Sequence, residues 1–113
     1  MRCLFHSEHY QASKYCSINV ACNGESSRFT SIPNVQGWKF SKDPSYIYYC
    51  SNETIHGVEF HEVPSIPSDG ISLVADMSSN FLSRPVDISK HGLIFAGAQK
   101  NSGIAGVAVT IGR

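Results

Sequence analysis

The chain has 113 residues, a formal net charge of zero at pH 7 with histidines neutral, and 16% charged residues. No segment is basic enough to indicate nucleic-acid binding, and no apolar run approaches the ~20 residues that span a membrane. The first nine residues lack the apolar stretch of a secretory signal, so we expect a cytoplasmic protein.

The first part of the chain is predicted to contain a helix end, one strand and a long loop. Residues 6–15 favour the end of a helix, with Lys14 near its C-terminus. Apolar and polar residues alternate over 16–22, which predicts a strand. Pro33, Gly37 and Pro44 interrupt residues 29–44, and we expect a loop there with at most one helical turn.

The cysteines predict no disulfide. Cys16 and Cys22 flank the first predicted strand, and six strand residues span about 20 Å, which is beyond the reach of a disulfide. With Cys3 and Cys50 they form no Cys-x-x-Cys pair. We expect all four to be reduced, as in a cytosolic protein.

The rest of the chain is dominated by short apolar strands. Aromatic and β-branched content predicts strands at 46–50, 71–75, 92–96 and 106–111. Apolar runs of this kind suit a parallel sheet that helices cover on both faces. Only the N-terminal helix and a short turn near 86–90 are available as cover. We therefore predict an α/β fold with a mainly parallel sheet and few covering helices, in which residues 1–113 form one unit without a second domain. The missing cover is expected elsewhere in a longer chain or on a partner.

Polar residues follow three of the predicted strands, where open α/β sheets bind ligands. These clusters cover 52–57, 76–80 and 97–101. Together they offer the hydroxyl of Thr54, the carboxylate of Asp76, the amide of Gln99 and the amine of Lys100.

These four groups are the chemistry that pyridoxal phosphate requires. A lysine must bond to the cofactor, and a carboxylate must keep the pyridine nitrogen protonated. An ion pair at ~3 Å and a dielectric of about 20 contributes on the order of 5 kcal/mol before desolvation. A desolvated pocket would also lower the pKa of the lysine. Taken singly, Lys100 reads as a solvated surface residue and Asp76 as a turn or cap residue. From the pattern alone both interpretations stay open.

Three strings carry a resemblance to a known family. They are YYCSNETIHGVEF at 48–60, LVADMSSNFLSRPVDISKHGLIFAGAQKN at 73–101 and AGVAVTIGR at 105–113. These strings closely resemble the phosphoserine aminotransferase family of fold-type I, pyridoxal-phosphate-dependent enzymes. The resemblance runs from about Ala12 to the last residue, and it makes the chain part of the large cofactor-binding domain.

The resemblance implies an activity, partners and site residues. Enzymes of this family are homodimers that exchange an amino group between phosphoserine with 2-oxoglutarate and 3-phosphohydroxypyruvate with glutamate, in serine biosynthesis. By matching motifs, Lys100 is the Schiff-base lysine and proton shuttle. Asp76 faces the pyridinium nitrogen, Thr54 lies at the phenolic oxygen side of the ring, and Gln99 lies by the phosphate. Supporting roles fall to Ser78, Ser79 and Asn80, which would hold Asp76, and to His56, which would shape the first motif.

Other interpretations remain beside this one. The family's phosphate loop, ring-stacking aromatic and substrate-holding arginine and histidine have no counterpart here, so we expect the isolated chain to be inactive. The alternatives are a non-catalytic truncated product and a fold-type I transaminase of the alanine–glyoxylate type. A metal module of Cys3, His6 and His9 is disfavoured, because that spacing spreads the side chains around a helix and a fourth ligand is not evident.

Overall fold

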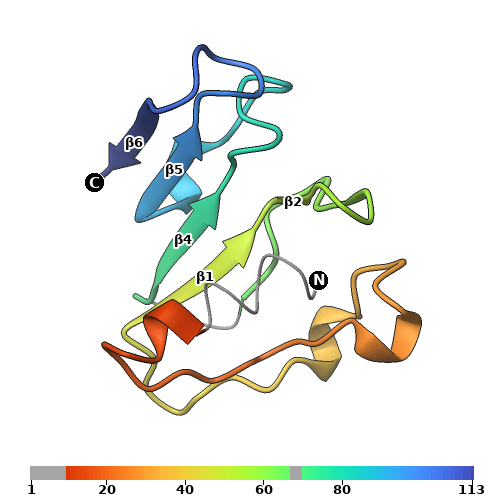
Figure 1. The fold of residues 1–113 in the computed structure, drawn as a ribbon. Helices are drawn as coiled ribbons and strands as arrows, with labels where there is room; N and C mark the ends of the chain where they lie inside the picture. The colour runs from red at the N-terminus through yellow and green to blue at the C-terminus, as the bar shows by residue number, and fades with distance from the viewer. Residues whose placement is uncertain (1–9, 67–69) are drawn as a thin grey trace.

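The structure is a computed structural model that describes residues 10–66 and 70–113. Its main sheet has four strands in the order β1-β4-β5-β6. These strands are β1 (Tyr46–Cys50), β4 (Ser72–Asp76), β5 (Leu93–Gly97) and β6 (Ala108–Gly112). β4 lies between β1 and β5 and pairs parallel with both, whereas β6 pairs antiparallel with β5. In Figure 1 the arrowheads of β1, β4 and β5 point the same way and that of β6 points back. The predicted mainly parallel sheet is confirmed.

The strand boundaries follow the glycines that precede the strands. The strand at 46–50 begins and ends as predicted, but the last three begin one or two residues late. Gly70 and Gly106 have φ values of 94° and 90°, a left-handed conformation that ends a turn before the ladder can begin. Beyond β5 the hairpin to β6 is closed by Gly97 opposite Ala108.

A small hairpin follows β1 that the sequence did not reveal. It consists of β2 (Asn52–Glu53) and β3 (Val58–Glu59), which pair antiparallel. The Glu53 carboxylate, 1% exposed, accepts the backbone N–H of His56 at 2.7 Å and that of Ile55 at 3.3 Å. Gly57 completes the turn with a φ of 69°. A side chain, rather than the glycine-rich dipeptide of a short hairpin, therefore organises this turn.

The strand predicted at 16–22 is wrong. Within the described part of the chain these residues belong to no strand, and they are held instead by the Lys39 N–H, which donates to Ala21 O at 2.8 Å. The apolar residues of the alternation point outward, with Ile18 37% and Val20 48% exposed. An alternating segment forms a strand only if another strand pairs with it, and none of the described strands pairs with residues 16–22.

Helical structure is sparse, as predicted. Residues 10–12 are helical, while positions 6–9 of the expected helix lie outside the described residues. Three short 3-10 turns follow: η1 (Glu25–Ser27), η2 (Val35–Gly37) and η3 (Ile88–Lys90). η2 and η3 confirm the turns expected in the loop and near 86–90. No helix among the described residues is long and apolar enough to cross a membrane.

The hydrophobic core lies on one face of the main sheet. Its buried members are Tyr49, Leu73, Ala75, Met77, Ile94 and Ala96. Loop residues such as Phe60, Val63, Phe81 and Val86 pack against it, in the place that helices occupy in a layered α/β domain. Side chains therefore alternate along each strand between this packed face and the opposite one.

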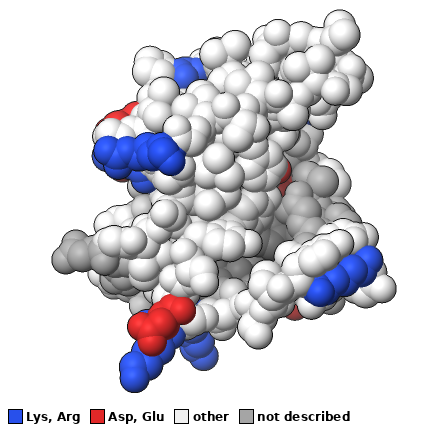
Figure 2. Space-filling view, turned by 90° about the vertical axis from the view of Figure 1, so that its left-hand side faces the viewer, with Lys and Arg blue, Asp and Glu red and all other residues white. Residues whose placement is uncertain are grey.

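The opposite face of the sheet is only half-covered by the described residues. Tyr48 and Phe95 stack there with ring centroids 6.3 Å apart, and both are half-buried. Elsewhere Tyr15 is 87% and Ile104 75% exposed. Figure 2, viewed from the β6 side, shows a surface that is mostly uncharged, with a few separate charged groups. Large apolar side chains are therefore exposed at several places on the surface of the described residues.

Candidate active site

The predicted site residues lie at or beyond the carboxyl ends of the parallel strands. Asp76 is the last residue of β4, in register with Cys50 of β1 and Phe95 of β5. Thr54 follows β2, and Gln99 and Lys100 lie in the turn after β5. In Figure 1 the segments after β4 and β5 rise from the same edge of the sheet.

Asp76 is half-buried on the less covered face. Its Oδ1 accepts the N–H of Ser78 at 2.8 Å, and the Tyr48 hydroxyl donates to Oδ2 at 3.5 Å, which is a weak contact. Within residues 10–66 and 70–113, no lysine, arginine or histidine forms an ion pair with it. The carboxylate thus keeps acceptor capacity for a positively charged group.

Ser78 and Ser79 connect Asp76 with the other segments of the site. The Gly97 N–H donates to Ser78 Oγ at 3.0 Å, across to the end of β5. The hydroxyls of Ser79 and Thr54 share a short hydrogen bond. Of the three residues expected to hold Asp76, only Ser78 bonds to it, whereas Ser79 bonds to Thr54 and Asn80 to residues of the hairpin.

Gln99 and Lys100 are exposed in a tight turn. Ala98 O accepts the N–H groups of Ser102 at 3.1 Å and Gly103 at 2.8 Å. A Cβ built on Gly97 would lie 2.5 Å from Gln99 Oε1, so the glycine leaves the space into which the Gln99 side chain folds back. The described residues do not enclose Lys100, and the desolvated pocket expected around the amine is not formed by them.

A polar cluster that the sequence did not reveal braces the β2–β3 hairpin. Arg84 pairs with Glu59 and also donates to Phe60 O at 3.2 Å. The Asn80 amide donates to Glu59 Oε1 at 2.8 Å and to Ser51 Oγ at 2.9 Å. The Asn80 hydrogen bond and the Arg84 charge hold the pKa of Glu59 below its usual value, against the effect of burial. These contacts join residues 21 to 29 positions apart, a separation at which sequence patterns give no signal.

His56 has the shaping role expected of it. Its backbone N–H and Nδ1 both contact the buried Glu53 carboxylate, Nδ1 at 3.0 Å. Burial raises the pKa of Glu53, but the hydrogen bonds from His56 and Ile55 outweigh this and leave that pKa below its usual value. Glu53 therefore stays ionised and keeps the turn that carries Thr54 closed.

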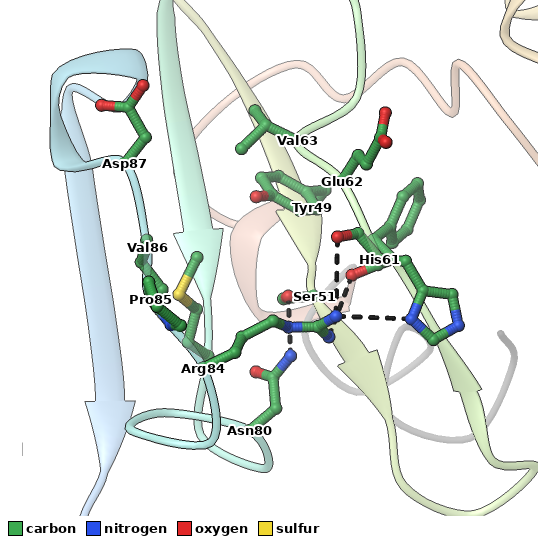
Figure 3. A pocket seen from close by; sticks show the side chains of 12 residues that line it. Tyr49, Ser51, His61, Glu62, Val63, Asn80, Arg84, Pro85, Val86 and Asp87 are labelled. Atoms are coloured by element: carbon green, nitrogen blue, oxygen red, sulfur yellow. Dashed lines mark hydrogen bonds between the residues drawn. The ribbon is translucent and has the colours of Figure 1, made fainter.

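The hollow in Figure 3 is not the predicted site. It lies on the packed face between Tyr49, Met77 and the segment from Arg84 to Asp87, and none of the four predicted cofactor residues lines it. Its volume of about 60 Å³ has room for a few water molecules but not for a coenzyme. Nearby, the buried His91 bonds through Nε2 to the Tyr49 hydroxyl at 2.9 Å, and burial raises the pKa of Tyr49 to about 12.

A metal site finds no support in the described part of the chain. It contains no group of three or more His, Cys, Asp or Glu residues that could hold an ion. No disulfide joins Cys16, Cys22 and Cys50, the three cysteines in the described part of the chain. The alternative module of Cys3, His6 and His9 lies outside the described residues.

Comparison with known proteins gives a consistent result. Residues 10–113 match the family described as aminotransferase class-V. Phosphoserine aminotransferase from Drosophila melanogaster is 52% identical over 103 residues, which cover 91% of this chain and 28% of that protein. The structure of phosphoserine aminotransferase from Bacillus circulans subsp. alkalophilus superposes with a TM-score of 0.85 at 38% identity, covering 92% of this chain and 28% of that one. A pyridoxal-phosphate-bound phosphoserine aminotransferase from Trichomonas vaginalis superposes with a TM-score of 0.66 at 51% identity, covering 72% of this chain and 22% of that one. The chain thus spans between a quarter and a third of the length of the first two proteins.

Proposed function

Because the chain belongs to the aminotransferase class-V family, we propose that it is part of a phosphoserine aminotransferase that uses pyridoxal phosphate. The 52% identity to the Drosophila melanogaster enzyme supports this substrate class. The complete protein would transfer an amino group between phosphoserine with 2-oxoglutarate and 3-phosphohydroxypyruvate with glutamate. Residues 1–113 would form part of its large cofactor-binding domain, and the complete protein would act as a homodimer in the cytoplasm.

One observation carries the proposal: an acid, a hydroxyl and an amine follow neighbouring strand ends. Asp76 has no cationic partner among the described residues, so its carboxylate suits a protonated ring nitrogen. Gly97 leaves the space that the Gln99 amide occupies, and this keeps the amide next to the end of β5. The donor set therefore fits pyridoxal phosphate, which when bound supplies an aldehyde for a lysine amine and a ring that withdraws electrons from the substrate.

Each of the four residues would then have a distinct task. Asp76 would hold the proton on the ring nitrogen, and the Ser78 N–H on Oδ1 would keep the carboxylate oriented. The Lys100 amine would bond to the cofactor and carry a proton to and from the substrate carbon. Thr54 would donate from its hydroxyl to the ring oxygen, and Gln99 would donate from its amide to the phosphate.

The test uses a chimaera, because the chain spans only 28% of its Drosophila melanogaster relative. In this chimaera, residues 10–113 replace the matching segment of that enzyme. The purified chimaera is incubated with pyridoxal phosphate, reduced with borohydride and mapped by peptide mass spectrometry. We expect the label on Lys100, and we expect Lys100→Arg to abolish it. Label spread over surface lysines such as Lys39, Lys42 and Lys90 would refute the site.

Substrate profiling separates the proposal from its alternatives. The chimaera should prefer phosphoserine as amino donor over alanine. A preference for alanine and glyoxylate would refute the substrate assignment while leaving the cofactor site intact. A chimaera that folds, melts cooperatively and takes up no cofactor would instead favour a non-catalytic product. Light scattering of the purified protein tests the homodimer, and fractionation of the source cells tests the cytoplasmic location.

A further inference from the structure

We propose that Ser78 and Ser79 are positioning residues that hold Asp76, Thr54 and the turn before Lys100 in one arrangement before the cofactor binds. This inference rests on the proposed function, since the site it concerns is the proposed cofactor site. It assigns a role to two side chains besides the four residues of the proposed cofactor site. We call this arrangement the serine bridge.

Three hydrogen bonds define the serine bridge. The Ser78 N–H donates to Asp76 Oδ1 at 2.8 Å, and Ser78 Oγ accepts the Gly97 N–H at 3.0 Å. The Ser79 and Thr54 hydroxyls bond to each other directly. Two adjacent residues therefore reach the end of β4, the end of β5 and the hairpin after β1, the three places from which the site is built.

The geometry gives Ser78 a different task from an ordinary loop serine. Its backbone fixes the acid and its hydroxyl fixes the strand that leads to the lysine, so one residue couples the two groups that the chemistry uses. Gly97 has no hydrogen bond partner for its N–H in the described residues other than this hydroxyl. An alanine at 78 would keep the first contact and lose the second, which would leave the half-buried N–H of Gly97 without an acceptor.

Ser79 has the corresponding task for Thr54. Thr54 is exposed at the tip of the hairpin, and its hydroxyl would otherwise rotate freely. The bond to Ser79 selects one orientation of that hydroxyl, which leaves a defined direction for the second hydrogen bond that a hydroxyl can make. Preorganisation of this kind strengthens ligand binding by reducing the ordering that binding requires.

The experiment compares Ser78→Ala with Ser83→Ala in the chimaera. Ser83 is the matched control, because its hydroxyl also bonds to a backbone group, donating to Asn80 O at 2.6 Å, but it makes no hydrogen bond to Asp76, Gly97 or Thr54. Borohydride labelling of Lys100 in the unsubstituted chimaera is done first. Cofactor dissociation constants, the pH midpoint of the absorbance of the lysine-bound cofactor, and melting temperatures without cofactor are then measured for both variants.

We expect Ser78→Ala to weaken cofactor binding roughly tenfold and to shift the absorbance midpoint, from the loss of one hydrogen bond to a half-buried donor. Ser83→Ala should lower the cofactor-free melting temperature comparably, with cofactor affinity and midpoint unchanged. If the two variants are indistinguishable in affinity and midpoint, the serine bridge is refuted while the proposed function stands. Absence of label at Lys100 in the unsubstituted chimaera overturns both.

A double-mutant cycle decides the matter even if Ser78→Ala does not fold. Ser79→Ala, Thr54→Ala and the double variant are compared for cofactor affinity. If Ser79 acts through Thr54, the Ser79→Ala effect should disappear in the Thr54→Ala background. Additive effects would show that the two hydroxyls act independently and would overturn the inference.

Discussion

Asn80 ties the β2–β3 hairpin to the loop after β4, and its replacement by alanine tests what that tie contributes. Its amide makes two hydrogen bonds, to Ser51 and to the ionised Glu59, from a side chain that is only 7% exposed. Each such bond contributes about 1 kcal/mol, and somewhat more when the acceptor is charged. Its Oδ1 is buried without a partner, so removing that oxygen offsets part of the loss. We expect Asn80→Ala to lower the free energy of local opening of the hairpin by about 2 kcal/mol.

Hydrogen exchange followed by mass spectrometry measures this local opening in the chimaera. Amides of residues 51–60 should exchange about 30-fold faster in Asn80→Ala, since 1.4 kcal/mol corresponds to a factor of ten. The matched control is Asn101→Ala, whose amide donates to Phe81 O at 3.0 Å from an exposed side chain. That variant should change the exchange by no more than about threefold. Equal acceleration in the two variants, or none in Asn80→Ala, would refute the assigned brace.

Three further predictions concern the core, the acid side of stability and the isolated chain. Ile94 is 2% exposed, so Ile94→Ala should cost about 2–5 kcal/mol and lower the melting temperature of the chimaera, whereas Ile88→Ala, at a side chain 46% exposed, should barely change it; equal shifts would contradict the assigned core. The folded state lowers the pKa of Glu59 from 4.5, so its stabilising contribution is complete above that value and is lost as the pH falls through the folded-state pKa. After correction for intrinsic rates, the amide hydrogens of the β2–β3 hairpin should exchange faster as the pH falls through this range, and Glu59→Gln should remove that acceleration. The same acceleration in Glu59→Gln would show that another group is responsible. Expressed alone, residues 1–113 should self-associate through exposed apolar side chains, and a monomeric, cooperatively melting 12.4 kDa species in gel filtration and calorimetry would contradict this.

Local signals predicted the central part of the fold well. The run of aromatic residues at 46–50 is a strand by its own composition, and the turns at Gly70 and Gly106 delay the starts of β4 and β6 by one and two residues. The strand predicted at 16–22 was wrong for a different reason. Alternation of apolar and polar residues shows that a segment could pair as a strand, but a strand forms only where another strand lies beside it. The β2–β3 hairpin was not predicted, because its turn depends on the buried carboxylate of Glu53 and not on a recognisable turn dipeptide.

The site was predictable in its chemistry but not in its supports. Strand-end position and residue type singled out Asp76 and Lys100, and the family resemblance gave them roles, which stay predictions until the chimaera is labelled. Ser78 was expected beside Asp76, but its second bond to Gly97 depends on the spacing between β4 and β5. The brace of Asn80, Glu59 and Arg84 depends likewise on contacts between distant segments, which composition and periodicity do not encode.

Under the proposed function, the closure of the β5–β6 hairpin bears on how Lys100 would work, because its bond to the cofactor would be released and re-formed in every catalytic cycle. Gly97 opposite Ala108, with the Ala98 N–H donating to Val107 O at 2.9 Å, fastens both ends of the excursion that carries Lys100. The base of this arm is therefore anchored, while the side-chain torsions of the lysine remain unrestrained. If Lys100 binds the cofactor as proposed, its amine would remain close to the cofactor after their bond breaks, at a high effective concentration, and would return without any rearrangement of the sheet.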